Sequence, residues 1–216
     1  MNQIIFYKDI VNDFKKVLVK KQKLYKVFFV LSIIILTISI IYYVFRFFKI
    51  SKNAKISDKV LNAYDIQALY NSNNKIELPS ILTKNGDMAD IVGILEIEKI
   101  NIRYPILSKY SDDFLEIALC KFAGNELNEY GNFCILGHNF SNGSFFSDLY
   151  LLDIGDIIKI YNINGEYVKY IVYDKFEIIP EDLSCTAQDY SIKEITLITC
   201  TNRDNKRLVI KAKEKR

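Results

Sequence analysis

The pattern of apolar positions divides the chain into an N-terminal helical part and a longer part made of short strands. Residues 27–45 (VFFVLSIIILTISIIYYVF) contain no charge. A helix of that length spans about 28 Å at ~1.5 Å per residue, close to the ~30 Å hydrocarbon core of a bilayer. We therefore predict a transmembrane helix over 27–45. The alternatives are a core helix, which would normally show a polar face, and a cleaved signal peptide, whose apolar region would be shorter.

A second helical pattern follows this apolar segment. Apolar residues over 56–70 recur at the spacing of a helix face, and residues 71–75 (NSNNK) predict a turn or linker. The resulting domain prediction is a short basic cytoplasmic tail at 1–26, the anchor at 27–45, a linker with a helical segment at 46–85 and a folded domain at 86–216.

From residue 91 onward the apolar positions predict short strands and few helices. The dipeptide Asn164-Gly165 lies between two alternating runs and is a strong signal for a β-hairpin. Short strands at regular spacing predict an all-β barrel or sandwich. The predicted strands are 91–97, 100–107, 131–137, 156–163, 166–179, 194–200 and 206–212.

Composition supports a packed domain, and the charge distribution supports a membrane. Half of the 216 residues are hydrophobic and a quarter are charged, which is typical of a chain with a core. The net charge of +3 arises from eleven Lys/Arg against two Asp/Glu in 1–55 and eighteen against twenty-four in 56–216. The mildly acidic folded part disfavours a nucleic-acid-binding domain. Six lysines within residues 15–26, just before the apolar segment, and four basic residues within 46–55, after it, favour a cytoplasmic N-terminus and an extracellular folded domain.

The chain contains a single histidine, so any Cys–His or Ser–His nucleophilic pair must use His138. His138 ends an apolar strand and begins the polar loop HNFSNGSFFSD, and such loops on a rigid scaffold often carry function. A purely structural histidine is the alternative interpretation.

Cys200 is the best candidate for the nucleophile among the four cysteines. It ends a predicted strand, and the loop after it contains Arg203 and leads to Arg207, a setting that can stabilise a thiolate. Arg207, at the start of the next strand, could donate to an oxyanion, although a solvated arginine is the alternative.

The other three cysteines are weaker candidates. Cys134 is four residues before His138 on the same strand, about 13 Å away at ~3.3 Å per residue. Cys120 lies in an apolar run and is expected to pack as a small hydrophobe. Cys185 follows Glu181 and Asp182, whose charges disfavour a thiolate.

Disulfide and zinc frameworks are the remaining uses of these cysteines. An exported domain with four cysteines could form two bridges, but the spacings resemble no compact framework and a domain of this size needs no staple. The absence of a Cys-x-x-Cys pair and the single histidine argue against a zinc site.

Several motifs resemble the sortases of Gram-positive bacteria. Thr196–Cys200 (TLITC) is similar to the Thr-Leu-x-Thr-Cys signature of that family, and Arg207 with an apolar strand follows after a short loop. Ile135–Asn139 (ILGHN) resembles the strand end that carries the family's histidine. Residues 92–106 look like the opening strands of the catalytic domain, and 151–162 like the stretch after the histidine loop. The resemblance covers roughly residues 86–216.

This resemblance implies an eight-stranded β-barrel on the outer face of the cytoplasmic membrane, after a transmembrane helix and a short helical linker. It implies that the Cys200 thiolate attacks the Thr–Gly bond of a Leu-Pro-x-Thr-Gly-like sorting signal. His138, as imidazolium, would protonate the leaving amine and later deprotonate the incoming one, and Arg207 would hold the substrate backbone and the oxyanion. The expected substrate-pocket residues are Thr199, Leu197 and Asn139.

The partners implied by the resemblance are surface proteins with a C-terminal sorting signal and an amine of a peptidoglycan precursor or a pilin. No cofactor is expected. Some class A relatives depend on calcium, but no acidic cluster with ligand spacing stands out in this chain.

The six-residue loop between Cys200 and Arg207 leaves no room for the helix found there in class B enzymes. No aromatic lid motif of the pilin-polymerising type is evident before residue 91. We therefore favour a class A- or D-like enzyme and keep class B open, because GHNFSNGSFF has some class B character. The rival functions are a pilin-polymerising sortase, a cysteine hydrolase with the same site, and a non-catalytic membrane-tethered β-domain.

Overall fold

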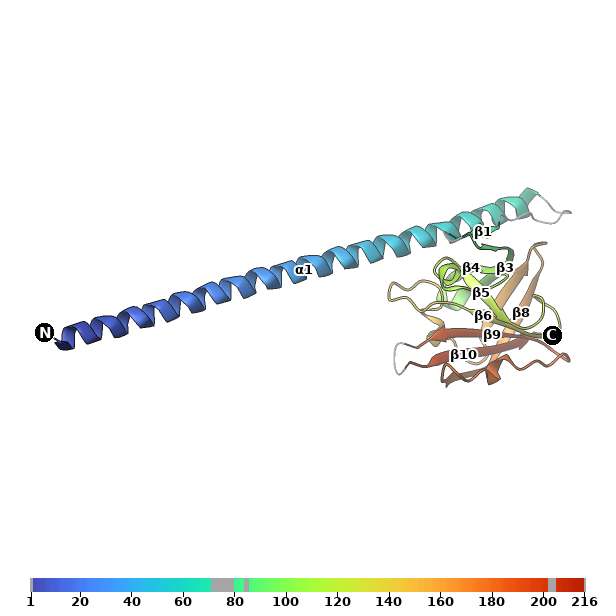
Figure 1. The fold of residues 1–216 in the computed structure, drawn as a ribbon. Helices are drawn as coiled ribbons and strands as arrows, with labels where there is room; N and C mark the ends of the chain where they lie inside the picture. Colours follow the sequence, from blue (N-terminus) through green and yellow to red (C-terminus); the bar gives the residue numbers. More distant parts are fainter. Residues whose placement is uncertain (1, 71–79, 84–85, 202–204, 216) are drawn as a thin grey trace. The chain divides into compact units, whose positions relative to one another are not determined.

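The computed structural model describes residues 2–70, 80–83, 86–201 and 205–215, and within the first helix it describes the side chains of 20–48 and 56–66. The chain forms two compact units, Met1–Ile50 and Ser51–Arg216. Helix α1 (Asn2–Tyr70) is continuous through the boundary between them (Figure 1). The turn expected at 71–75 lies outside the described residues, and the domain boundaries expected from the sequence stay a prediction.

In the first unit, α1 has the composition of a membrane-spanning helix. Lys20–Phe48 is long and apolar enough to cross a membrane, and its side chains are exposed. Two of its polar residues are satisfied within the helix: the Ser32 hydroxyl donates to the Phe29 carbonyl at 2.7 Å and the Thr37 hydroxyl to the Ile34 carbonyl at 2.8 Å. A helix satisfies its own backbone groups, so a segment of this kind is compatible with a bilayer.

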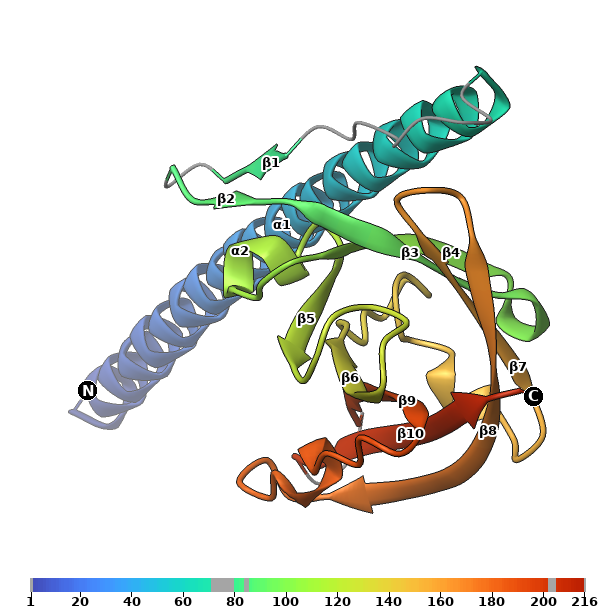
Figure 2. The same ribbon diagram turned by 90° about the vertical axis from the view of Figure 1, so that its right-hand side faces the viewer.

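The second unit is a closed eight-stranded barrel with the order β10-β8-β7-β3-β4-β5-β6-β9 (Figure 2). This confirms the predicted fold. Its strands are β3 (Ile91–Ile97), β4 (Ile102–Leu107), β5 (Leu119–Ala123), β6 (Gly131–Leu136), β7 (Ile157–Asn162), β8 (Tyr167–Ile178), β9 (Lys193–Cys200) and β10 (Arg207–Glu214). Strand β9 pairs in parallel with β6 and antiparallel with β10.

Shorter elements connect or cover the barrel. They are β1 (Ile81–Leu82), β2 (Met88–Ala89), the 3₁₀ helices η1 (Glu98–Ile100), η2 (Leu149–Leu151) and η3 (Ser184–Thr186), and helix α2 (Asp112–Leu115). The predicted hairpin is present between β7 and β8, where Gly165 adopts a positive φ of 85°. That conformation is open to glycine at little cost, which explains the Asn-Gly signal.

The last described turns of α1 belong to the second unit and pack on the barrel. Val60 and Tyr64 are buried. The Ser57 hydroxyl donates to the Ile117 carbonyl at 2.6 Å, and the Arg103 guanidinium forms two hydrogen bonds of 2.7 Å with the Asp65 carboxylate. The helix predicted over 56–70 therefore exists, as the C-terminal part of α1 and not as a separate element.

Both faces of the sheet formed by β6, β9 and β10 are buried over most of their length. The barrel core takes alternate residues of each strand, for example Ile135, Leu197 and Ile210. The residues between them face outward, and a second apolar cluster forms on that outer face. It contains Cys185, Ile198 and Val209, with Phe122, Leu136, Phe176 and Ile178 packed against it.

Candidate active site

The register of three neighbouring strands brings the three expected catalytic residues to one level. Arg207 of β10 is the pairing partner of Cys200 of β9. Strand β6 runs parallel to β9 with Leu136 opposite Ile198, and the Gly137 amide donates to the Ile198 carbonyl at 3.2 Å. Continuing this register by two residues places His138 level with Cys200. Neighbouring strands lie about 4.8 Å apart, so the three residues occupy adjacent positions.

All three residues also belong to the same face of the sheet. Successive side chains of a strand point to opposite faces. Ile198 and Val209 lie in the outer cluster, so Cys200 and Arg207, each two residues away, face outward as well. Leu136 packs against the same cluster, so the alternation also assigns His138 to the outer face. The paired strands thus present Cys200 and Arg207 side by side, and the continued line of β6 leads to His138 beside Cys200.

Cys200 differs from the other cysteines in its accessibility. The four cysteines are free; Cys120, Cys134 and Cys185 are buried and Cys200 is exposed. Burial raises the pKa of Cys120 and of Cys134 to about 12. The disulfide alternative therefore finds no support among these residues, and Cys200 is the cysteine that a substrate can reach.

Cys185 is held protonated for a reason that the sequence indicated only in part. Burial is the main cause that raises the pKa of its thiol, and the charge of Asp182 adds to the effect. The sequence interpretation gave the acidic neighbours the whole role, because burial of this residue is not visible in its local pattern.

His138 is half-buried, with its ring 4.6 Å from the ring of Phe140. Burial lowers the pKa of His138, and the negative charges of Glu116 and Asp112, at the α2 turn, act in the opposite direction. The His138 backbone is fixed as well, since its carbonyl accepts from the Phe146 amide at 2.9 Å. Burial therefore favours the neutral imidazole, on a backbone that is held in place.

Gly137, just before His138, allows the backbone to pack closely against the side chains of Phe146 and Leu119. A Cβ atom at this position would lie 2.5 Å from the Phe146 ring and 2.6 Å from the Leu119 side chain. Atoms cannot approach that closely, so a larger residue would displace the strand end that carries His138.

Two of the three expected substrate-pocket residues hold the site together. The Asn139 side-chain amide donates to the Cys200 carbonyl at 2.8 Å. The Thr199 side chain is buried and its hydroxyl donates to the Gly137 carbonyl at 2.8 Å. These two bonds tie the ends of β6 and β9 to each other, on either side of the His138–Cys200 pair.

Leu197 does not occupy the position that the resemblance implied. Its side chain is fully buried in the barrel core, on the face opposite to Cys200. This follows from the alternation of β9, because Leu197 is three residues from Cys200 and an odd separation reverses the face. Its placement supports a packing role and not a contact with substrate.

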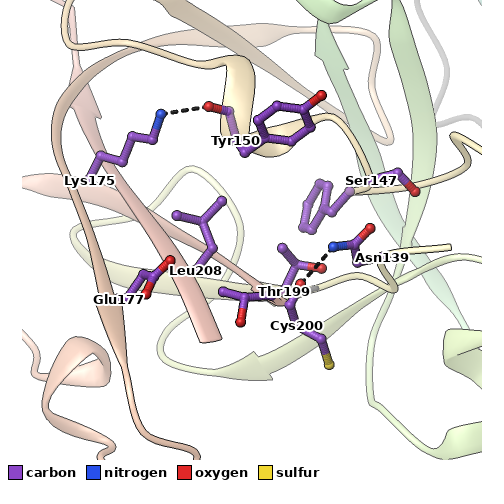
Figure 3. Close-up of a pocket in the computed structure, with 10 residues that line it drawn as sticks. Asn139, Ser147, Tyr150, Lys175, Glu177, Thr199, Cys200 and Leu208 are labelled. Carbon is purple, nitrogen blue, oxygen red and sulfur yellow. Dashed lines mark hydrogen bonds between the residues drawn. The ribbon is translucent and has the colours of Figure 1, made fainter. Parts of the chain in front are cut away.

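A cavity of about 310 Å³ lies beside the end of β9 (Figure 3). Asn139, Tyr150, Glu177, Thr199 and Cys200 are among the residues that line it. Lys175 donates to the carbonyl of Tyr150 at 2.6 Å and closes one side. The sulfur of Cys200 points away from the other lining side chains, consistent with its place on the outer face.

The sequence interpretation did not identify the outer apolar cluster near Cys200. The alternation of β9 and β10 contains it, because both faces of these strands are apolar (ITLITC, LVIKA). In the part of the chain that the structure describes, no group of three or more His, Cys, Asp and Glu residues could hold a metal ion. Arg203, the other arginine near Cys200, lies outside the described residues.

Comparisons with known proteins agree on one family. A family model described as the sortase domain matches residues 95–215. No match was found among curated proteins. A Clostridium perfringens structure described as a sortase D5 transpeptidase is 26% identical with a TM-score of 0.58, covering 77% of this chain and 99% of that chain.

Two further solved structures have the same fold. Sortase A from Corynebacterium diphtheriae, as a lid mutant, is 27% identical with a TM-score of 0.55 and covers 62% of this chain and 74% of that chain. Sortase C1 from Streptococcus suis is 24% identical with a TM-score of 0.54 and covers 59% and 74%, respectively.

Proposed function

The chain belongs to the sortase family, and on that premise we propose that it is a membrane-anchored transpeptidase with Cys200 as nucleophile, His138 as acid and base, and Arg207 as oxyanion donor. One observation carries the assignment of these residues. Arg207 pairs with Cys200, the exposed cysteine among the described residues, and the β6–β9 register, if continued two residues past Leu136, brings the chain's only histidine level with Cys200.

Cys200 would attack as a thiolate. The sulfur forms a bond to the carbonyl carbon of the scissile peptide, and the negative charge moves to the carbonyl oxygen. A donor fixed at that oxygen can contribute several kcal/mol, about 3–4 by analogy with other oxyanion sites. Arg207, directly across from Cys200 in the pairing, is in a position to supply this donor.

His138 would carry the proton in both half-reactions. As imidazolium it gives its proton to the leaving amine, and the acyl group stays on Cys200 as a thioester. As neutral imidazole it then takes a proton from the incoming amine, which attacks the thioester and releases the Cys200 thiolate. Burial favours the neutral imidazole, which suits the second step and makes the imidazolium of the first step the minority form near pH 7.

The substrates that we propose are those of the family. The acyl donor is a surface protein with a Leu-Pro-x-Thr-Gly-like sorting signal, cleaved between Thr and Gly. The acceptor is an amine of a cell-wall precursor. Phe122, Leu136, Phe176 and Ile178 are apolar side chains that pack on the outer cluster and are only partly buried, which supports binding of a peptide with apolar side chains near Cys200. A pilin amine as acceptor is the alternative within the same chemistry.

We propose a class A- or D-like enzyme. The six-residue loop between Cys200 and Arg207 supports this choice, as does the similarity to structures described as sortase D5 and sortase A. Class B stays the alternative on the basis of the polar loop after His138.

We also propose that the apolar part of α1, within Lys20–Phe48, anchors the enzyme in the cytoplasmic membrane. The excess of lysine before residues 27–45 supports a cytoplasmic N-terminus with the barrel outside the cell.

Incubation of residues 51–216, the compact unit that contains the barrel, with quenched sorting-signal peptides tests the proposal. We expect cleavage between Thr and Gly, and acyl transfer when an amine acceptor is added. The Cys200→Ala variant should be inactive. The Cys120→Ala variant is the matched control, because that buried thiol packs near α1 and α2, and it should keep its activity.

The two rival functions predict other products. A cysteine hydrolase would release the free acid even at high amine concentration. A non-catalytic domain would cleave no peptide, and the Cys200 thiol would react no faster than an ordinary exposed cysteine.

A further inference from the structure

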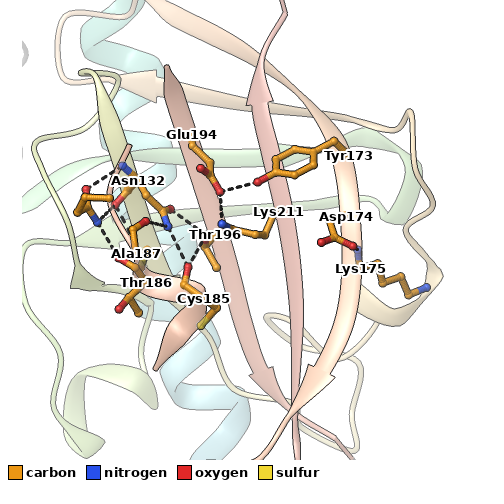
Figure 4. Close-up of polar contacts among 12 residues, drawn as sticks. Asn132, Tyr173, Asp174, Lys175, Cys185, Thr186, Ala187, Glu194, Thr196 and Lys211 are labelled. Atoms are coloured by element: carbon orange, nitrogen blue, oxygen red, sulfur yellow. Dashed lines mark hydrogen bonds and ion pairs between the residues drawn. The ribbon is translucent and has the colours of Figure 1, made fainter. Parts of the chain in front are cut away.

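The connection from β8 to β9, residues 179–192, lies partly against the outer face of the barrel (Figure 4). Its centre is η3 (Ser184–Thr186). Cys185 in this helix is only 3% exposed and packs with Ile198 and Val209 in the outer apolar cluster. The η3 segment, defined here as residues 184–188, thus covers part of the apolar surface that begins beside Cys200.

A single buried asparagine holds the η3 segment to the barrel. The Asn132 side-chain amide, on β6, donates to the carbonyl of Cys185 at 2.9 Å and to that of Ala187 at 3.1 Å. Its side-chain oxygen accepts from the Thr196 hydroxyl of β9 at 2.8 Å. Asn132 is fully buried, and its bonds to Cys185 and Thr196 are shielded from water, while the bond to Ala187 is partly buried. An amide or carbonyl left unpaired in such a place is costly.

Gln188 completes the attachment from the segment's side. Its side-chain oxygen accepts from the backbone amide of Asn132 at 2.9 Å. Its side-chain nitrogen donates to the backbone carbonyls of Asn132 at 3.0 Å and Thr186 at 2.9 Å. Asn132 is therefore bonded to the η3 segment through both its side chain and its backbone. These bonds fix the height and the lateral position of Cys185 over the sheet.

The η3 segment lies close to Cys200 along β9. Cys185 packs on Ile198, which is two residues from Cys200, or about 7 Å at ~3.3 Å per residue. A peptide whose scissile carbonyl sits at Cys200 would place its preceding side chains over this stretch. The η3 segment then limits the apolar surface that those side chains can occupy.

We propose that Asn132 is a specificity-determining positioning residue, which acts by holding the η3 segment as one wall of the peptide groove. The claim rests on the proposed function for its substrate, a peptide bound with its scissile bond at Cys200. Asn132 itself does not touch the peptide. Its effect passes through Cys185 and its neighbours in the segment.

The same outer face provides a matched control. Glu194, 4% exposed, is bonded to the Lys211 ammonium at 2.5 Å and to the Tyr173 hydroxyl at 2.8 Å. These contacts join β8, β9 and β10 to one another (Figure 4). The Tyr173→Phe variant removes a partly buried side-chain hydrogen bond on this face without removing a hydrogen bond to the η3 segment.

The first test measures access to the Cys185 thiol in the full chain with Cys200→Ala, using a small maleimide and peptide mapping. In the Asn132→Ala and Gln188→Ala variants the maleimide should modify Cys185 at least about fivefold faster than in the parent chain that carries only Cys200→Ala. The lost hydrogen bonds allow the segment to open more often. Tyr173→Phe should label at the parent rate. Equal rates in all four proteins would show that Asn132 does not hold the segment.

The second test measures kcat and KM with Cys200 intact, on sorting-signal peptides that differ in the residues before the Thr. Asn132→Ala and Gln188→Ala should raise KM about tenfold for the preferred peptide and reduce discrimination among peptides, with kcat and the pH profile unchanged. A decrease in kcat with KM unchanged, or an equal increase in KM in the Tyr173→Phe variant, would indicate a general loss of structure and overturn the specificity role.

The two proposals fail in distinguishable ways. If the unmodified chain cleaves no peptide, the proposed function is wrong and the specificity role with it, while the labelling rates still decide whether Asn132 holds the segment. If the unmodified chain cleaves peptides and the variants show the same KM values, only the role of Asn132 is wrong.

Discussion

His138 and Cys200 lie in different environments, and the proposed chemistry depends on this difference. Cys200 is exposed at the end of β9, whereas His138 is half-buried beside Phe140. The exposed thiol is open to a peptide, while burial shifts the imidazole toward its neutral form. Each residue therefore has a behaviour that can be measured separately from turnover.

Thiol labelling should single out Cys200. At pH 7.5 a soluble maleimide should modify one thiol of the folded protein, because burial removes the other three from solvent and raises their pKa values. In denaturant four thiols should react. Peptide mapping identifies the site. Fast modification of Cys120 or Cys134 in the folded protein would contradict the burial on which the assignment depends.

The single histidine allows its pKa to be read directly by NMR. We expect His138 to titrate below 6.5, and Glu116→Gln to lower its pKa further, because the Glu116 charge favours the imidazolium. Glu166→Gln, at the β7–β8 hairpin, is the control and should leave the pKa unchanged. A value above 6.5 would contradict the dominant effect of burial.

The same shift has a consequence for stability. The folded-state pKa lies below that of the unfolded chain, so near pH 6 the unfolded chain binds more protons. The contribution of His138 to the free energy of unfolding is therefore complete above pH 6.5 and is lost as the pH falls toward the folded-state pKa. Comparing the pH dependence of unfolding in the unmodified chain and in His138→Gln measures this contribution.

Substitutions of the two proposed partners of Cys200, His138 and Arg207, should lower kcat/KM by different amounts. His138→Ala should lower kcat/KM by about 10²–10⁴, the usual contribution of acid–base catalysis. Arg207→Ala should lower it by about 10²–10³, as for an oxyanion donor. Lys206→Ala is the matched control: its charge, paired with Glu177 at 3.5 Å, lies beside Arg207, and its loss should change kcat/KM by less than about threefold. Equal losses of kcat/KM in Arg207→Ala and Lys206→Ala would argue that Arg207 acts through its charge in general and not as an oxyanion donor.

At the scale of elements, the ends of β6 and β9 are joined by a buried hydrogen bond. Thr199→Val removes the donor to the Gly137 carbonyl, and we expect a loss of about 1–3 kcal/mol in the free energy of unfolding, because the carbonyl stays buried and unpaired. Thr201 lies two residues further along the chain and is only partly buried, so Thr201→Val should lower the free energy of unfolding by less. Urea unfolding measures both. Equal losses would mean that the Gly137 carbonyl finds another partner.

The sequence predicted the strands with a strong apolar pattern and missed those without one. Residues 91–97 were predicted and observed as β3 with identical bounds. Strand β5 was missed because it has five residues, follows α2 after a short turn and pairs with β4 at only two positions. Its existence depends on closure of the barrel, a long-range property that no local window contains.

The same reasoning explains what could be predicted of the site. Cys200, His138 and Arg207 were predicted from inventory and from motifs; Arg207 pairs with Cys200, and the β6–β9 register continued past Leu136 leads to His138 at the same level. Leu197 was placed in the substrate pocket because it belongs to the TLITC motif, but the alternation of a strand sends it into the core. Asn132 lies six residues before His138, and its partners in 185–188 are far away in sequence, so nothing local indicated its role.

At the scale of the whole molecule, the end of α1 is part of the barrel's unit. The Asp65–Arg103 pair is bidentate but partly exposed, so Asp65→Asn should cost about 1 kcal/mol of unfolding free energy. Asp58→Asn, exposed on the same helix, should change it by less than 0.5 kcal/mol, as is typical of surface sites. Thermal unfolding of residues 51–216 measures both. No difference between the two variants would show that this contact does not fasten the helix.

The proposed anchor makes a second prediction at this scale. The full chain should fractionate with membranes, and residues 51–216 alone should not. In intact cells a protease added outside should cut the loops of the barrel unit, because the lysine-rich N-terminus stays in the cytoplasm. Protection of the barrel in intact cells, with cutting only after lysis, would reverse the proposed orientation.

Intact-mass analysis of the reaction on the protein tests the central claim most directly. Residues 51–216, mixed with a sorting-signal peptide and stopped with acid within seconds, should gain the mass of the peptide up to its Thr. Peptide mapping should locate that mass on Cys200, and an added amine should remove it as a peptide–amine product. Cleavage without an adduct on Cys200, or an adduct on another residue, would contradict the account.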